Sequence, residues 1–164
     1  MKKLVLSLAA AAALALPSAA SAQVTDNGVI SVSATVQTVL RFGASTGLDF
    51  GTITPGTAAT GQGSIELIRN VGTTLSFPDA TALGQLVRTG GTETISPTYT
   101  CGVGATATTI TTAFTNCSTA TLSLAAPTGQ STSYVIFNGS IAASATNLTP
   151  GDYTGTIKIL ATSN

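Results

Sequence analysis

The sequence Ile30-Ser31-Val32-Ser33-Ala34-Thr35-Val36 alternates strictly between apolar and small polar residues. Successive side chains of a β-strand point to opposite faces, so every second residue of this stretch would share one apolar face. That face consists of Ile30, Val32, Ala34 and Val36. A second alternating stretch, Gly151–Ile159, places Ile157 and Ile159 on one face. We therefore predict a β-strand near each end of the domain, and an apolar terminal strand can complete the sheet of a neighbouring molecule.

Residues 1–22 have the features of a secretory signal peptide. Lys2 and Lys3 give a basic start, a Leu- and Ala-rich stretch follows, and small residues end at Ala22. The apolar stretch is shorter than the roughly 20 residues that a stable membrane-spanning helix needs. We expect the protein to be secreted through the periplasm, without stable membrane insertion.

Removal of the signal peptide would leave about 142 residues beginning at Gln23, enough for one domain with its own core. We divide this mature chain into an N-terminal extension or donor strand, 23–37, and a β-sandwich domain, 38–164.

The mature chain carries few charges. Four basic residues remain against six acidic residues, which gives a net charge of about −2. Nucleic-acid binding requires clustered Lys and Arg to neutralise phosphates, so we expect no nucleic-acid partner. The polar surface must consist mainly of uncharged Thr, Ser, Asn and Gln side chains, and a weakly charged surface favours self-association.

Cys101 and Cys117 are the only cysteines, in a chain expected to enter an oxidising compartment. We therefore predict one intramolecular disulfide. A metal site or a catalytic thiol is the alternative, but two cysteines without any histidine supply too few soft ligands and no base.

The sequence beyond the signal shows no sustained helical periodicity. Short alternating runs rich in Thr, Val, Ser and Ala are separated by turn residues, which indicates an all-β fold. Strands at this spacing predict two packed antiparallel sheets or a barrel, and the sandwich is commoner at this length. The expected strands are Val29–Leu40, Leu48–Ile53, Gly63–Ile68, Thr73–Phe77, Gln85–Arg88, Glu93–Thr100, Thr106–Phe114, Thr119–Leu124, Ser133–Ile141 and Tyr153–Ala161.

Four glycine-containing strings predict turns. Thr54-Pro55-Gly56 and Thr149-Pro150-Gly151-Asp152 each place a Pro with fixed φ before a Gly that accepts positive φ, and Gly90-Gly91 suits a tight hairpin. Gly61-Gln62-Gly63 matches half of a dinucleotide-binding fingerprint but lacks its third glycine and helix. We interpret it as a hairpin turn.

Catalytic chemistry has little support in this sequence. The absence of histidine excludes imidazole-based triads and histidine-ligated metals, and the six acidic residues are dispersed. A carboxylate pair assembled through space would need a sugar cleft, which three Tyr and no Trp do not indicate. We expect no enzyme activity, no catalytic residues, no metal site and no cofactor.

Three segments carry a resemblance to secreted bacterial β-sandwiches. Leu48-Asp49-Phe50-Gly51-Thr52-Ile53-Thr54-Pro55-Gly56 resembles an element of a pilin-like domain family of unknown function, the Leu-Asp-Phe-Gly-Thr-Ile type. Leu148-Thr149-Pro150-Gly151-Asp152-Tyr153-Thr154-Gly155-Thr156-Ile157 is similar to the ending of many chaperone-usher fimbrial subunits, and Ile30–Val36 is similar to the start of one class of them. Together these segments cover about a third of the mature chain.

The resemblance implies an immunoglobulin-like antiparallel β-sandwich that lacks one strand, with the gap filled by a donor strand. The partners would be copies of itself or related subunits, and a periplasmic chaperone and usher, with a final location at the cell surface or in a fimbrium. The implied donor residues are Val24, Ile30, Val32, Ala34 and Val36. The implied edge of the acceptor groove comprises Tyr153, Ile157 and Ile159.

A simpler interpretation stays open. Val29–Leu40 would then be the first strand of a self-contained domain, pairing within its own chain. The protein would act as a monomeric secreted or surface binding module, with carbohydrate as one possible ligand class.

Overall fold

A computed structural model describes residues 28, 30–78, 83–114, 116–117, 121–143, 145 and 147–164. The chain divides into two units, 1–35 and 36–164. In the first unit, the described residues are exposed and form neither strand nor helix. The second unit contains all the regular structure described below.

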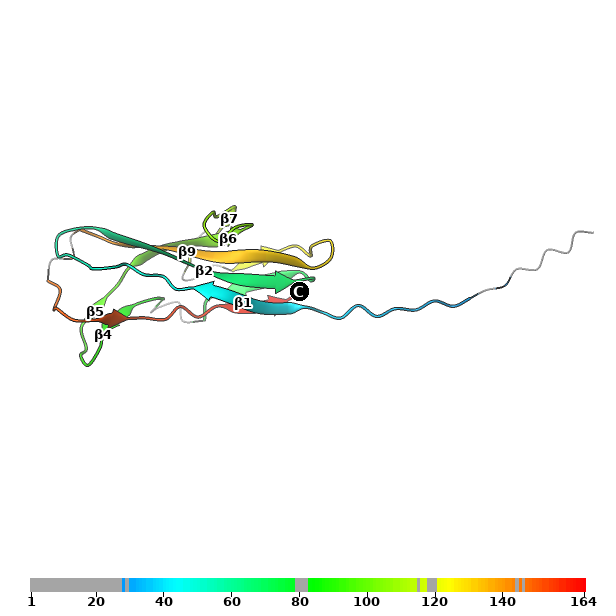
Figure 1. Cartoon of the computed structure of the whole chain (residues 1–164), viewed down its shortest axis with the longest axis horizontal. Coiled ribbons are helices and arrows are strands. Elements are labelled where there is room, and N and C mark those ends of the chain that lie inside the picture. Colours follow the sequence, from blue (N-terminus) through cyan, green and yellow to red (C-terminus); the bar gives the residue numbers. More distant parts are fainter. Residues whose placement is uncertain are drawn as a thin grey trace, which may run out of the picture. The chain divides into compact units, whose positions relative to one another are not determined.

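The described part of the chain contains eleven β-strands and no helix (Figure 1). All strand pairs are antiparallel. One sheet has the order β1-β2-β9-β6-β7, and two smaller sheets have the orders β11-β3-β8 and β10-β4-β5. This arrangement confirms the prediction of an all-β antiparallel sandwich. The strands are β1 (Leu40–Thr46), β2 (Ala59–Arg69), β3 (Thr73–Ser76), β4 (Leu86–Arg88), β5 (Thr94–Ile95), β6 (Thr98–Gly104), β7 (Thr112–Ala113), β8 (Leu122–Leu124), β9 (Ser131–Ile141), β10 (Tyr153–Thr154) and β11 (Leu160–Ser163).

The central pair of the large sheet is β2 and β9. These strands stay in register along their whole length, from Ala59 opposite Ile141 to Arg69 opposite Ser131. Leu67 on β2 and Val135 and Phe137 on β9 are buried in the hydrophobic core, as the period of two requires. The pair therefore forms the rigid centre on which the other elements are placed.

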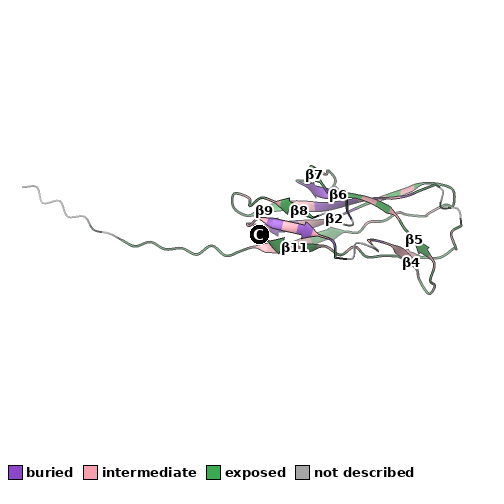
Figure 2. Ribbon diagram, turned by 180° about the vertical axis from the view of Figure 1, so that it is seen from behind, coloured by how far each residue is buried: buried purple, intermediate pink, exposed green. Residues whose placement is uncertain are grey.

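The core lies between the large sheet and the β11-β3-β8 sheet. Buried side chains from β2, β6 and β9 form one cluster with Leu75 of β3 and with Phe77, which follows it. Figure 2 marks the buried residues in purple along the ribbon. The Phe77 ring lies 5.0 Å from the Phe114 ring and 5.3 Å from the Phe137 ring, within the range of favourable aromatic pairs.

The predicted disulfide between Cys101 and Cys117 is present. Their Cα atoms lie 5.7 Å apart, a usual separation for a disulfide. The bond connects β6 with the chain after β7, and both cysteines are buried in the core. It therefore holds a long irregular segment against the large sheet.

Two predicted turns are confirmed. Thr57 N–H donates to the Thr54 carbonyl at 3.0 Å, and Gly56 has a φ of 84°. Between β4 and β5, Gly91 N–H donates to the Arg88 carbonyl at 3.1 Å, and Gly90 has a φ of 74°. Both glycines occupy a conformation that residues with a side chain rarely adopt.

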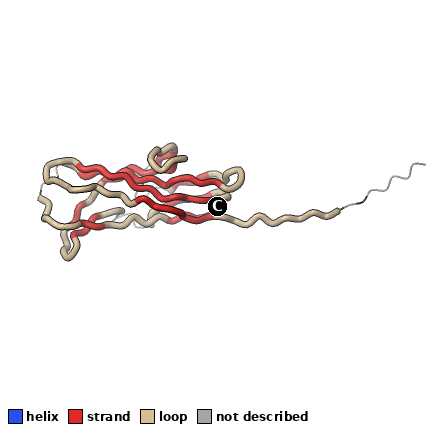
Figure 3. Tube along the Cα trace, viewed as in Figure 1, coloured by secondary structure: helices blue, strands red, loops and turns tan. Residues whose placement is uncertain are grey.

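Five predicted strands are wrong or only partly right (Figure 3). Glu93–Thr100 is divided into β5 and β6 by residues 96 and 97, which form no strand. Among the described residues, no strand precedes Leu40, and none is formed over Leu48–Ile53. Thr106–Phe114 is mostly a turn with a single bridge between Thr106 and Thr109, and contains only the short β7. Tyr153–Ala161 is divided into β10 and the start of β11. In each case the local alternation is present, but a continuous partner strand is not.

The interpretation of Gly61-Gln62-Gly63 as a hairpin turn is also wrong. Both glycines lie inside β2, paired with Gly139 and Phe137 of β9. The missing side chains serve the packing of another segment, which is described next.

Candidate strand-accepting groove

A groove follows one side of the 36–164 unit, where strand pairing stops. On one wall, β1 ends at Thr46 and the chain continues without a strand until Ala59. On the other wall, residues 155–159 form no strand between β10 and β11. Figure 1 shows these two segments as the cyan-to-teal chain after β1 and the red chain leading into β11.

The part of the groove nearer β1 is a cavity of about 330 Å³. Its walls come from the end of β1, from β2 and β9, and from the segment before β11. Most of its lining side chains are aliphatic or aromatic, so it suits apolar side chains rather than charged ones. The lining residues are Ser45, Thr46, Gly47, Leu48, Phe50, Gly63, Ser64, Ile65, Gly84, Leu86, Tyr99, Phe137, Gly155, Thr156, Ile157 and Ile159.

A second cavity of about 670 Å³ continues the groove between residues 48–55 and 148–155. It shares Leu48, Phe50, Leu86 and Gly155 with the first cavity. Its lining includes Asp49 and Asp152 and is more polar. The groove therefore changes along its length from an apolar half to a mixed half.

Two glycines allow the wall after β1 to lie directly on the large sheet. A Cβ atom added to Gly63 would lie 2.8 Å from Leu48 N and 2.9 Å from Leu48 Cβ. A Cβ atom added to Gly139 would lie 2.6 Å from Cζ of Phe50. Glycine inside a strand often marks such a close approach. The wall residues Leu48 and Phe50 therefore lie directly over two positions of the sheet that carry no side chain.

The floor of the apolar half contains Tyr99 and Phe137, whose rings meet edge to face at 6.5 Å. The Tyr99 hydroxyl donates to the Gly84 carbonyl at 2.7 Å. Burial raises the pKa of Tyr99, because it disfavours the phenolate. Tyr99 therefore contributes a neutral aromatic surface at working pH.

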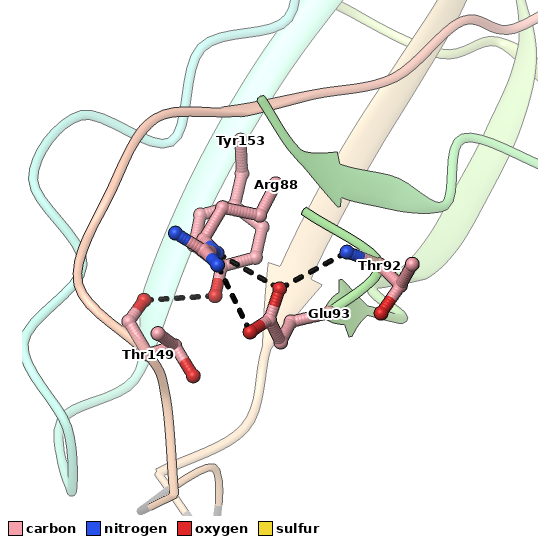
Figure 4. A network of polar contacts seen from close by, with 5 residues as sticks. All are labelled: Arg88, Thr92, Glu93, Thr149 and Tyr153. Atoms are coloured by element: carbon pink, nitrogen blue, oxygen red, sulfur yellow. Dashed lines mark hydrogen bonds and ion pairs between the residues drawn. The ribbon is translucent and has the colours of Figure 1, made fainter. Parts of the chain in front are cut away.

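A polar network lies at the far end of the groove, at the β4–β5 hairpin (Figure 4). Arg88 donates to Glu93 through Nε at 2.8 Å and Nη2 at 3.1 Å. The hydrogen bond and charge of Arg88 lower the pKa of Glu93 to about 2. Tyr153 lies opposite Arg88 in the β10–β4 pair, and its hydroxyl donates to the Thr149 carbonyl at 2.8 Å. This network fixes one end of the wall that contains Tyr153.

The residues expected at the groove edge lie along this groove. Ile157 and Ile159 are half-buried, line the apolar half and pack against the core. Tyr153 lines the mixed half. The three residues therefore share one wall but belong to two cavities.

The residues expected to act as donors lie outside any strand. Ile30, Val32 and Val36 are 88%, 90% and 85% exposed, and Ala34 is also exposed. Val24 lies outside the described residues. Large aliphatic side chains spaced two residues apart would share one apolar face in a strand, and at this exposure they have no partner in the described part of the chain.

The opposite wall and the floor of the groove were not predicted from the sequence. Leu48 and Phe50 fall in the predicted strand Leu48–Ile53, and Tyr99 and Phe137 fall in the predicted strands Glu93–Thr100 and Ser133–Ile141, with no site role predicted for any of the four. The available signal was the glycine spacing in Gly61-Gln62-Gly63, because two glycines two residues apart remove the side chains from one strand face.

The described residues give no support for a metal site or a membrane-spanning helix. They contain no group of three or more His, Cys, Asp or Glu side chains placed to hold a metal. They also contain no helix long and apolar enough to cross a membrane. No family model and no curated protein matches the chain. Function is therefore inferred from the groove, the N-terminal segment and their chemistry.

Proposed function

We propose that the protein is a structural subunit of an extracellular fimbria or surface fibre, assembled by strand exchange. The observation that carries this proposal is an apolar groove between two segments that form no strand, in a chain whose exposed residues 30–36 alternate apolar side chains and have no partner among the described residues. A strand inserted there gains main-chain hydrogen bonds, and its alternate side chains enter the cavity.

The occupant that fits best is the segment Ile30–Val36 of a second copy. Its polar alternate residues, Ser31, Ser33 and Thr35, face solvent when the apolar residues face the groove. The segment carries no charge, which suits the apolar half of the groove. A donor segment and a groove on one subunit give a head-to-tail contact that does not close, and such contacts build filaments.

The proposed route of assembly follows from the same chemistry. A subunit with an empty apolar groove requires protection before assembly, so we propose a periplasmic chaperone and an usher as transient partners. The Cys101–Cys117 disulfide is consistent with passage through an oxidising compartment. The final location in this proposal is the cell surface or a fimbrium.

The test is to delete residues 24–36 from the mature chain. The deletion is expected to leave a folded monomer, because Gln37 onward keeps its contacts, and to abolish oligomers in light scattering and fibres in electron microscopy. A matched control replaces only Ser31 and Ser33 by Thr, which preserves the apolar face and should preserve assembly. Fibres formed by the deletion variant would contradict the proposal.

A second candidate, a monomeric binding module for neutral carbohydrate, is favoured by one observation. The large sheet bears a depression of about 460 Å³ lined by uncharged polar groups across β2, β9 and β6. Gln62 Nε2 donates to Asn138 Oδ1 at 2.6 Å within it. Binding of neutral glycans that is lost in Asn138→Ala, together with a monomer indifferent to residues 24–36, would favour this function.

A further inference from the structure

β1 contains a bulge shortly before it reaches the groove. Two of its residues, Gly43 and Ala44, stand opposite the single residue Glu66 of β2. Such an insertion of one residue is a β-bulge, which bends the strand and leaves the extra residue out of the ladder. The pairs that flank the bulge are Phe42 with Leu67 and Ser45 with Ile65.

The Glu66 side chain lies over this bulge and bonds to it. Its Oε2 accepts a hydrogen bond from Ala44 N–H at 3.2 Å, and its Oε1 accepts one from the Tyr134 hydroxyl at 3.4 Å. Tyr134 stands opposite Glu66 in the β2–β9 pair. A Cβ atom added to Gly43 would lie against the Glu66 carboxylate and 3.1 Å from Glu66 Cβ. The glycine therefore leaves the space through which the carboxylate reaches the bulge.

The bulge decides which residues after it face the groove. Residues directly opposite each other in a strand pair share one face of the sheet, and Ile65 lines the apolar half of the groove. Ser45 stands opposite Ile65, and the same count places Gly47 level with Gly63. Both residues are small, so this wall leaves space beside the floor of the groove.

A register without the bulge would place larger side chains on this wall. A slip of one residue moves every side chain of a strand to the opposite face. The position opposite Ile65 would then fall to Ala44. The position opposite Gly63 would fall to Thr46, and the next inward position would fall to Leu48. These side chains would occupy space that the bulged strand leaves free.

We propose that Glu66 is a positioning residue that fixes the bulge of β1 and thereby keeps the groove open for a donor strand. Glu66 lines neither cavity of the groove, so it acts through the strand and not by touching the occupant. This inference rests on the proposed function, because it concerns the same groove. It adds the residue that sets the shape of one wall.

The test measures peptide binding to the full mature chain. A fluorescent peptide spanning residues 28–38 is titrated with protein at concentrations at which light scattering shows a monomer, and its anisotropy gives the dissociation constant. Glu66→Leu removes the acceptor for Ala44 N–H, whereas Glu66→Gln retains a carbonyl oxygen that can accept the same bond. Urea unfolding establishes that each variant is folded.

The three variants of β2 have different expected affinities. Glu66→Leu should weaken peptide binding about tenfold, the effect of losing a hydrogen bond to a charged group. Glu66→Gln should retain most of the affinity. Gln62→Leu is the matched control, because Gln62 lies on the same face of β2 but outside the bulge, and it should bind the peptide as the parent does.

Deletion of Ala44 separates the bulge from every other role of Glu66. The deletion removes the extra residue but leaves Ser45 opposite Ile65, so the wall keeps its register without the carboxylate. Peptide binding should be retained in this variant and should stay unchanged when Glu66→Leu is added. Gly43→Ala is an independent perturbation that displaces the carboxylate and should weaken binding. It carries the test should the deletion variant fail to fold.

Two results would overturn the inference and leave the proposed function standing. One is that Glu66→Leu and Gly43→Ala are folded and bind the peptide as the parent does. The other is that Glu66→Leu weakens binding equally with and without Ala44, because the carboxylate would then act other than through the bulge. A parent chain that does not bind the peptide would contradict the proposed function, and the inference would fail with it.

Discussion

The β2–β9 pair and the groove side differ in one respect, which is whether an alternating segment has a partner. β2 and β9 pair in register over eleven residues and bury their inward side chains. Residues 155–159 alternate just as well, with Ile157 and Ile159 on one face, yet form no strand. Alternation therefore specifies a face, and the arrangement of the other strands decides whether that face is closed.

The sharpest way to test this difference is to truncate one aliphatic side chain in each region. Leu67→Ala should lower the free energy of unfolding by about 2–5 kcal/mol, because Leu67 is fully buried in the central pair. Ile157→Ala should lower it by about 1 kcal/mol, because Ile157 is only half-buried in the monomer. Urea unfolding of monomeric protein measures both changes. Equal losses would contradict the view that the groove is open.

Removal of the disulfide tests what holds the irregular segment between Cys101 and Cys117 against the large sheet. The double variant Cys101→Ala, Cys117→Ala should lose about 3 kcal/mol, the chain-entropy value for a loop of this size. Thermal unfolding of the parent with and without reductant provides an independent comparison. A loss below about 1 kcal/mol would show that packing alone keeps this segment in place.

Substitution by alanine is expected to affect stability differently at two glycines on the groove side. Gly139→Ala should destabilise by about 1–3 kcal/mol, because the added methyl group meets the Phe50 and Tyr99 rings. Gly47→Ala is the matched control, since no atom lies within 4 Å of the added Cβ. Chemical unfolding of both variants measures the difference. A neutral Gly139→Ala would show that the wall at Phe50 does not lie on the sheet.

The smallest expected effect is the pH dependence of the Arg88–Glu93 pair. The pKa of Glu93 is lowered to about 2 from an ordinary value of 4.5, so the folded state favours the ionised carboxylate. Its stabilisation is fully present above pH 4.5 and is lost as the pH falls toward 2. The melting temperatures of the parent and Glu93→Gln should therefore differ slightly at pH 7 and converge near pH 2. A gap that widens on acidification would contradict this assignment.

The predictable parts of the fold are turns, which depend on local sequence, and segments whose strand pattern is matched by a partner strand in the structure. Ser133–Ile141 and Gly63–Ile68 fall within β9 and β2, and the cysteine pairing followed from compartment and count. Thr54–Gly56 and Gly90–Gly91 were correct because turn geometry is local.

The failures concern contacts between distant segments. Gly61 and Gly63 are separated from Gly139 by more than seventy residues, and only the assembled sheet shows why they are small. Leu48–Ile53 has a good strand pattern, but Phe50 lies over Gly139 instead of in a ladder. The groove therefore could not be found from alternation alone, which only places Ile157 and Ile159 on one apolar face.

Hydrogen exchange at residues 155–159 tests the central claim most directly. The measurement uses the variant lacking residues 24–36, with and without a peptide spanning residues 28–38, and a control peptide with Ile30, Val32 and Val36 replaced by Ser. The account predicts that the parent peptide slows exchange at 155–159 and that the control peptide leaves it unchanged. Exchange at these residues that is indifferent to both peptides would contradict the claim that the groove accepts this strand.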